Sequence, residues 1–223
     1  MKKKPAAIDE LLGIMARLRA PNGCPWDREQ DHQSLRWHAV EEVYELMDAI
    51  EARDDHELEE ELGDLLLQVV FHSQLARERG VFDFEQVAAR ISQKLIHRHP
   101  HVFGDTKVKN SDQVLVNWEQ LKRAEKHGTR HARPSALDGI PAHLPALLRA
   151  EKLVKKARRA HLAVPAPVRP LTRAALGREL FALATLAQAR GWSAEDLLRA
   201  ETKKQERAFR RAERRVPAPS TNP

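Results

Sequence analysis

Two long segments of helical character, separated by only two residues, constrain most strongly what this chain can fold into. We predict helices over about 33–53 and 56–79, with Asp54 and Asp55 supplying the turn and the N-cap of the second helix. Gly80 is then expected to end the second helix. Because so short a turn makes two helices fold back on each other, the sequence predicts an antiparallel helical hairpin.

The rest of the chain also favours an all-α protein. Aromatic residues make up only 5% of the sequence, and segments rich in Ala, Leu, Glu, Arg and Lys dominate it. Prolines and Asn22-Gly23 predict a loop over 21–27, and Pro-rich segments at 129–145 and 164–170 predict further breaks. The remaining helices are expected at 7–20, 83–99, 111–128, 145–160, 171–190 and 194–215.

Composition excludes several classes of protein. No run approaches 18 uncharged apolar residues, so we expect no membrane-spanning segment. Asp9 and Glu10 interrupt the apolar stretch near the basic start of the chain, which makes it a poor signal peptide. A single cysteine, Cys24, excludes an intramolecular disulfide and a multi-cysteine zinc site, and fits a reducing cytoplasm.

Acidic residues are concentrated in the predicted hairpin, although the chain as a whole has a net charge of +6. Residues 41–66 hold twelve acidic side chains and one basic one, which leaves 37 basic and 20 acidic residues elsewhere. Glu42 and Glu45 are three residues apart, as are Glu61 and Asp64, so each pair shares one flank of its helix. The hairpin would bring the two pairs face to face, where like charges repel each other.

Two interpretations of these carboxylates remain open from spacing alone. The first is an ordinary solvated acidic face. The second is a site for a divalent cation such as Mg²⁺, which takes oxygen ligands and would relieve the repulsion. The apolar neighbours Val43, Leu46, Leu62 and Leu65 favour the second interpretation for the two pairs.

Several blocks of sequence carry a resemblance to a known family. "EEVYE" followed by "ELGD" resembles the EExxE…ExxD signature of the all-α nucleoside triphosphate pyrophosphohydrolases. "NGCPWDREQ", "HRHPHVFGD", "NWEQLK" and "SALDGIPAHLPALLRAEKLVKKA" resemble the MazG branch of that superfamily. The blocks occur in this order over residues 8–160, and the similarity continues weakly to about 215.

The resemblance implies a helical, usually dimeric enzyme that uses Mg²⁺, with Mn²⁺ as a substitute, to hydrolyse NTPs or dNTPs to the monophosphate and pyrophosphate. It implies that Glu41 orients or deprotonates the attacking water. By the same match, the metal ligands would be Glu42, Glu45, Glu61 and Asp64. An enzyme of this kind is expected to act in the cytoplasm as a homodimer.

A triphosphate also needs cationic and aromatic partners. Lys94 and Arg98 are four residues apart on one predicted helix, and Lys122 follows Trp118 by four on another. The basic side chains could bind phosphate oxygens and Trp118 could stack on a base. The alternative for each is an ordinary solvated or packing side chain, and the family blocks around Arg98 and Lys122 favour the substrate role.

The C-terminal half looks like a shortened, degenerate copy of the acidic module. An offset of 114 residues aligns Gly63 with Gly177, but places Ala175 and Arg178 where Glu61 and Asp64 would be. We therefore expect a catalytic domain over 1–128, a linker over 129–145, a degenerate helical region over 146–215 and a disordered tail over 216–223. Leu176, Leu180, Leu183 and Leu186 are expected to bury one face of the C-terminal helices.

Two functions of different class therefore remain. One is a Mg²⁺-dependent pyrophosphohydrolase with its site in the N-terminal half. The other is a catalytically weak helical protein that binds nucleotides or nucleic acid or serves as a scaffold. The second draws on residues 145–223, which carry 18 Lys and Arg against 7 Asp and Glu.

Overall fold

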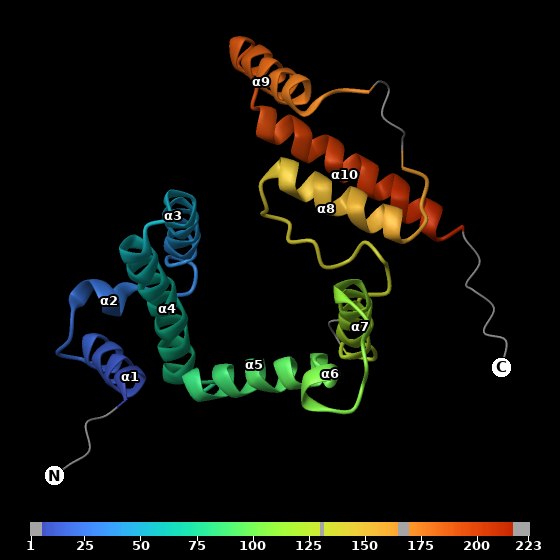
Figure 1. The fold of residues 1–223 in the computed structure, drawn as a ribbon. Helices are drawn as coiled ribbons and strands as arrows, with labels where there is room; N and C mark the ends of the chain where they lie inside the picture. Colours follow the sequence, from blue (N-terminus) through green and yellow to red (C-terminus); the bar gives the residue numbers. More distant parts are fainter. Residues whose placement is uncertain (1–5, 130–131, 165–169, 216–223) are drawn as a thin grey trace. The chain divides into compact units, whose positions relative to one another are not determined.

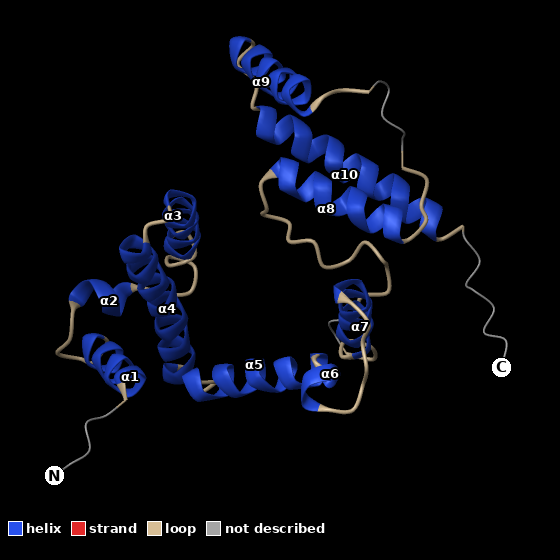
Figure 2. Ribbon diagram, in the orientation of Figure 1, coloured by secondary structure: helices blue, strands red, loops and turns tan. Residues whose placement is uncertain are grey.

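The computed structural model describes residues 6–129, 132–164 and 170–215. These residues form ten helices and loops, and no strand occurs among them (Figures 1 and 2). The expectation of an all-α fold is confirmed for this part of the chain. The chain divides into two compact units, residues 1–118 and 119–223, and the boundary lies within helix α7.

The first unit is built around the hairpin. Helices α3 (His38–Ala52) and α4 (Asp55–Glu78) lie side by side, joined through Arg53 and Asp54. Asp54 caps α4, because its side chain accepts hydrogen bonds from the backbone N–H groups of His56 and Glu57. The other helices of this part are α1 (Ala7–Leu18), α2 (Pro25–Glu29), α5 (Phe84–Arg98), α6 (Pro100–Phe103) and the first part of α7 (Ser111–Ala124).

Helix α3 begins five residues later than the sequence predicts. Asp31 Oδ1 accepts hydrogen bonds from the backbone N–H groups of Gln33 and Ser34, which fixes a turn ahead of the helix. The turn directs Leu35 into the core, where its side chain is only 1% exposed. Local hydrogen bonding and burial therefore override the helical tendency of residues 33–37.

The prediction of a loop throughout residues 21–27 is also wrong in part. Pro25 opens the short helix α2, where its missing N–H costs nothing because the first N–H groups of a helix have no intrahelical partner. Arg19, just after α1, donates to the backbone carbonyls of Asp27 and Gln30 and makes two 2.7 Å hydrogen bonds to Glu78. The end of α1, the α2 loop and the end of α4 are thus joined by one guanidinium.

The core of the first unit lies toward the C-terminal half of α4. It consists of Met15, Leu35, Val70, Phe71 and Leu75, with Ile8, Leu11, Leu12, Leu67 and Phe84 packed against it. In α3, by contrast, Ala49 is the one residue that is buried. The half of the hairpin that carries the acidic residues is therefore held mainly by helix–helix contact, and much of its apolar surface stays exposed.

The second unit contains α8 (Ala146–Arg159), α9 (Arg173–Ala189) and α10 (Ala194–Glu213). Helices α8 and α10 pack together over a core of Leu137, Leu153, Ala157, Leu162 and Phe209. The loop before α8 is tied to α10: Ser135 Oγ and the N–H of Ala136 donate to Glu213, and Arg210 pairs with Asp138 at 2.8 Å.

The expectation that α9 buries a leucine face is wrong for this chain on its own. Leu176, Leu180, Leu183 and Leu186 are all exposed, and Phe181 beside them is 76% exposed. In α9 the buried residue is Ala187, near the turn that leads into α10. The predicted tail over 216–223 lies outside the described residues. Within the described chain, no helix combines the length and the apolar character that crossing a membrane requires.

Candidate metal and nucleotide site

The hairpin brings three of the four predicted metal ligands together. Glu42 and Glu45 come from α3 and Glu61 comes from α4, and one carboxylate oxygen from each lies within 4.8 Å of the other two. Glu42, Glu45 and the buried Ala49 recur at helical spacing, so all three lie on the face of α3 that packs against α4. The face-to-face arrangement predicted from the sequence therefore occurs for these three carboxylates.

The fourth predicted ligand, Asp64, lies beside this group. Its carboxylate is close enough to raise the pKa of both Glu42 and Glu61, although it is not one of the three that converge within 4.8 Å. Glu41, predicted to act on the water, is exposed on α3 with one carboxylate oxygen 3.8 Å from Nδ1 of His38. It is not one of the carboxylates that converge within 4.8 Å.

Loss of solvent and mutual repulsion raise the pKa of two carboxylates of the cluster. Loss of solvent raises the pKa of Glu42, and the charges of Asp64 and Glu45 raise it further. Loss of solvent also raises the pKa of Glu61, with added repulsion from Glu45, Asp64 and Glu42. Both shifts have the direction expected where negative charges are brought together without a compensating positive charge.

One oxygen of the cluster has no hydrogen-bond partner. Glu61 Oε2 is shielded from solvent, and no protein group among the described residues donates to it. A buried, unpaired carboxylate oxygen is costly in a folded protein. The three converging carboxylates of Glu42, Glu45 and Glu61 are a donor set suited to a hard cation such as Mg²⁺ or Mn²⁺. The residues present therefore fit a divalent metal.

Sequence reasoning missed Gln68, which belongs to the same site. Gln68 lies one turn after Asp64 on α4, and its side-chain amide donates to Glu42 Oε1 at 3.3 Å. The available signal was a polar residue within the apolar run "LLLQVV", at helical spacing from Glu61 and Asp64. Such a residue can equally face solvent, so its burial could be known only from the structure.

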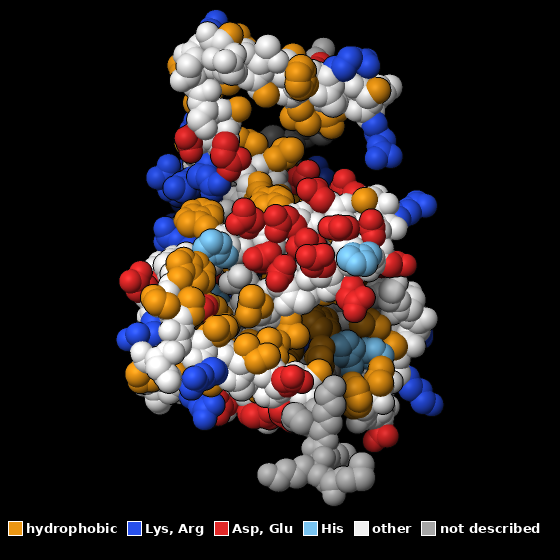
Figure 3. Space-filling view, turned by 90° about the vertical axis from the view of Figure 1, so that its left-hand side faces the viewer, with side chains coloured by type: hydrophobic (Ala, Val, Ile, Leu, Met, Phe, Trp, Pro, Cys, Tyr) orange, Lys and Arg blue, Asp and Glu red, His pale blue; other side chains and the backbone are white. Residues whose placement is uncertain are grey.

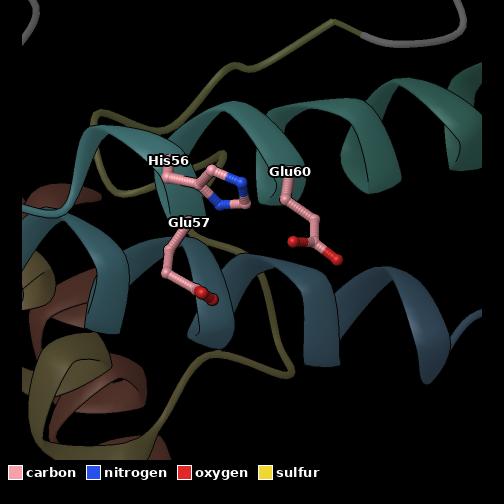
Figure 4. Close-up of side chains that lie close together, drawn as sticks. All are labelled: His56, Glu57 and Glu60. Carbon is pink, nitrogen blue, oxygen red and sulfur yellow. The ribbon is translucent and has the colours of Figure 1, made fainter.

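A second acidic group lies at the start of α4. His56, Glu57 and Glu60 place one ligand atom each within 4.8 Å of one another, and Figure 4 shows their side chains converging. All three side chains are exposed, whereas Glu42 and Glu61 of the first group are half-buried. Acidic residues in the first turns of a helix interact favourably with its dipole, so this cluster has an ordinary structural explanation.

Two predicted substrate residues meet near the end of α5. The guanidinium carbon of Arg98 lies 5.3 Å from the ring centroid of Trp118, which is a cation–π contact. The His99 and Trp118 rings also meet in a T-shaped arrangement, with 4.9 Å between ring centroids. Arg98 and Trp118 are both half-buried. The structure therefore places a cation and an aromatic ring together at the end of α5.

The two predicted lysines are placed less closely. Lys94 is exposed on α5, one turn before Arg98, and Lys122 is half-buried on α7, one turn after Trp118. Lys94 and Arg98 thus lie toward the end of α5, and Trp118 and Lys122 lie on α7; none of the four belongs to the hairpin that holds the carboxylates.

The surface of the hairpin combines charge with exposed apolar groups. Figure 3 shows acidic side chains gathered into one patch, with apolar side chains exposed nearby. The exposed apolar residues of the hairpin are Val40, Val43, Tyr44, Met47 and Ile50 on α3 and Leu62, Leu66 and Val69 on α4. On α3 this stripe lies on a different face from the one that carries Glu42 and Glu45.

Comparison with known proteins matches this part of the chain to one domain family. Residues 30–103, which include the hairpin and the end of α5, match the MazG nucleotide pyrophosphohydrolase domain. The matched segment thus contains every carboxylate of the cluster and Arg98.

Relatives extend the similarity beyond that segment. The chain is 43% identical over 235 residues to a nucleoside triphosphate pyrophosphohydrolase of Escherichia coli strain K12, covering 95% of this chain and 89% of the relative. It is 45% identical over 157 residues to the nucleoside triphosphate pyrophosphohydrolase/pyrophosphatase MazG of Thermotoga maritima, covering 70% of this chain and 59% of the relative. A nucleoside triphosphate pyrophosphohydrolase of Mycobacterium tuberculosis is 39% identical over 155 residues, which are 69% of this chain and 45% of the relative.

Proposed function

Because this chain belongs to the MazG family of nucleoside triphosphate pyrophosphohydrolases, we propose that it hydrolyses NTPs or dNTPs to the monophosphate and pyrophosphate at the α3–α4 hairpin. The observation that carries the proposal is Glu61: one of its carboxylate oxygens converges with oxygens of Glu42 and Glu45 on the facing helix, and its Oε2 is shielded and unpaired among the described residues. The groups proposed to hold Mg²⁺ or Mn²⁺ are Glu42, Glu45, Glu61 and Asp64.

Each part of the site has a separate task. A divalent cation held there would offset the charge of the triphosphate and lower the pKa of a coordinated water. Glu41, exposed on α3 and next to Glu42 in the sequence, is proposed to orient the attacking water and take its proton. Since Glu41 has contact with solvent, it can release that proton after each turnover.

The substrate is proposed to be held by the basic and aromatic residues of α5 and α7. Arg98 can form two parallel hydrogen bonds to a phosphate, and its contact with Trp118 restricts the guanidinium to few orientations. Trp118 is proposed to offer a ring face to the base. Lys94 and Lys122 are proposed to add positive charge for the outer phosphates.

A homodimer is part of the proposal. A two-helix hairpin cannot bury both of its faces, and the apolar stripe on α3 is exposed in the single chain. A second copy of the chain that packs against this stripe would cover it without occupying the face that carries the carboxylates. Activity is proposed to take place in the cytoplasm, since the single Cys24 fits a reducing compartment.

The C-terminal half is proposed to serve a supporting role. Ala175 and Arg178 stand on α9 at the positions that the offset equates with Glu61 and Asp64, and a cationic Arg178 would repel a metal. Several basic side chains of this half are already paired: Arg149 with Glu206, Arg199 with Glu195, and Arg210 with both Glu206 and Asp138. Their engagement argues against nucleic acid binding as the main function.

Identification of the products tests this proposal. The intact protein is incubated with a panel of NTPs and dNTPs and Mg²⁺, and the products are separated by ion-exchange chromatography. We expect the monophosphate and pyrophosphate in equal amounts, and turnover reduced by orders of magnitude in Glu45→Gln. The exposed Glu59→Gln serves as the control and should keep its activity. A diphosphate with orthophosphate, or an active Glu45→Gln variant, would contradict the proposal.

A further inference from the structure

The burial of the Gln68 side chain is not explained by a gain in the stability of the fold. Its side chain is only 7% exposed, although glutamine is mostly a surface residue. Its amide nitrogen makes a single, long hydrogen bond to Glu42, and its carbonyl oxygen Oε1 is shielded without a partner among the described residues. An apolar side chain of the same shape would avoid the cost of that unpaired oxygen.

The position of Gln68 connects it to the carboxylate cluster. It follows Asp64 by four residues and Glu61 by seven, so all three share one face of α4. Its hydrogen bond crosses from α4 to Glu42 on α3 and joins the two helices at the cluster. The amide must present its nitrogen to Glu42, because two oxygens facing each other would repel.

Glu42 needs such a partner more than an ordinary surface glutamate does. It is half-buried among negative groups, and repulsion from Glu45 and Asp64 favours rotation of its carboxylate away from them. A donor fixed by a buried helix position resists that rotation. Groups that orient a ligand to a metal in this way commonly change metal affinity by tenfold or more.

We propose that Gln68 is a positioning residue that holds the carboxylate of Glu42 beside Glu45 and Glu61, so that the three carboxylates bind a divalent cation together. The inference rests on the metal site of the proposed function. It adds a residue outside the acidic signature and accounts for the buried amide. In this proposal, the free-energy cost of burying Gln68 is offset by stronger cation binding, because the ligands are already ordered before the cation binds.

Binding of Mn²⁺ alone tests this role without reference to turnover. Isothermal titration calorimetry on the intact protein gives the dissociation constant of wild type and Gln68→Met, which keeps the length of the side chain and loses the hydrogen bond. We expect the constant to rise about tenfold or more. The matched control is Gln74→Met on the same helix, where Gln74 donates to Glu78 at 2.9 Å on the surface, and its constant should not change.

Thermal unfolding in EDTA separates positioning from a structural role. Gln68→Met should unfold at the wild-type temperature or above it, because it removes a shielded, unpaired oxygen. A lower unfolding temperature with unchanged Mn²⁺ affinity would overturn the inference. Gln68→Leu, a second apolar replacement, should show the same pair of results.

A double variant tests whether Gln68 acts through Glu42. Gln68→Met should weaken Mn²⁺ binding in wild type and have no further effect in a Glu42→Gln background. Independent, additive losses would overturn the inference. A wild-type protein that does not bind Mn²⁺ would instead contradict the proposed metal site, whereas wild-type binding that Gln68→Met leaves unchanged would contradict only the role of Gln68.

Discussion

Glu61, a proposed metal ligand, is held in an electrostatically unfavourable environment. One of its oxygens is shielded and unpaired, and partial burial and neighbouring carboxylates raise its pKa. If Glu61 holds a cation as proposed, the metal-free chain carries this repulsion and the bound cation relieves it. Stability and metal binding therefore respond to Glu61 in opposite directions.

We predict that Glu61→Gln raises the thermal unfolding temperature of the metal-free protein and lowers its response to Mg²⁺. The amide removes one negative charge from the cluster while keeping the shape of the side chain. Because a cation that binds the native state stabilises it, the loss of one ligand weakens binding and reduces that stabilisation. Differential scanning fluorimetry with EDTA or Mg²⁺ measures both effects. The exposed Glu59→Gln is the control. A wild-type shift with Mg²⁺ that persists in Glu61→Gln would contradict the assignment.

The pair of His32 and His72 should make stability depend on pH. Their Nδ1 atoms are 2.8 Å apart and their rings stack, so one nitrogen must donate and the other must accept. Burial lowers the pKa of His72, and the charge of His32 lowers it further. The folded protein thus favours neutral His72, while the unfolded chain binds a proton at its ordinary pKa of about 6.5.

The free energy of unfolding should therefore have its full value above about pH 6.5. It should fall as the pH is lowered from there through the pKa of His72 in the folded protein. Urea unfolding at several pH values between about 7.5 and 5.5 measures this slope. His72→Phe keeps an aromatic ring without a titrating group and should flatten it. The exposed His97→Asn should leave the slope at its wild-type value. An equally steep slope in His72→Phe would show that the His32–His72 pair is not the source of the pH dependence.

At the scale of the helices, Arg19 should contribute measurably to stability. Its guanidinium donates to both oxygens of Glu78 and to two backbone carbonyls, and its side chain is 9% exposed. Arg19→Lys cannot reproduce this fork and should lower the free energy of unfolding by about 1–2 kcal/mol. Arg17→Lys, at an exposed position in the last turn of α1, should change the free energy of unfolding little. Equal urea midpoints for the two variants would refute the prediction.

The hairpin could be predicted from sequence because its determinants are local. A two-residue turn, the capping side chain of Asp54 and carboxylates three residues apart fix where α3 and α4 meet. The start of α3 could not be predicted, because it depends on the hydrogen bond from the backbone N–H of Ser34 to the Asp31 carboxylate and on the burial of Leu35. Gln68 was missed for a similar reason, since its environment is set by the facing helix.

At the scale of the whole molecule, the exposed apolar stripe on α3 predicts association. Met47 lies in that stripe, on another face of the helix from Glu42 and Glu45. Met47→Glu should convert the proposed dimer to a monomer, because a charge buried in an interface without a partner is costly. Light scattering after size exclusion gives the mass. Ala52→Glu, exposed at the end of α3, is the matched control, and a Met47→Glu protein that is still dimeric would contradict this interface.

The C-terminal half shows what a pattern of apolar residues cannot establish. The spacing of Leu176, Leu180, Leu183 and Leu186 predicts a buried face, yet the structure leaves these side chains exposed. Spacing specifies that a helix is amphipathic without specifying what covers it. The absence of carboxylates at Ala175 and Arg178 is, by contrast, a matter of residue identity and can be taken directly from the sequence.

The central claim is that a divalent cation binds between α3 and α4, and anomalous diffraction from a crystal soaked in Mn²⁺ tests it most directly. The account predicts an anomalous peak among the carboxylates of Glu42, Glu45 and Glu61, which already converge within 4.8 Å. The same crystal contains the second cluster, His56, Glu57 and Glu60, as an internal comparison. A peak at that cluster alone, or no peak at the hairpin, would contradict the account.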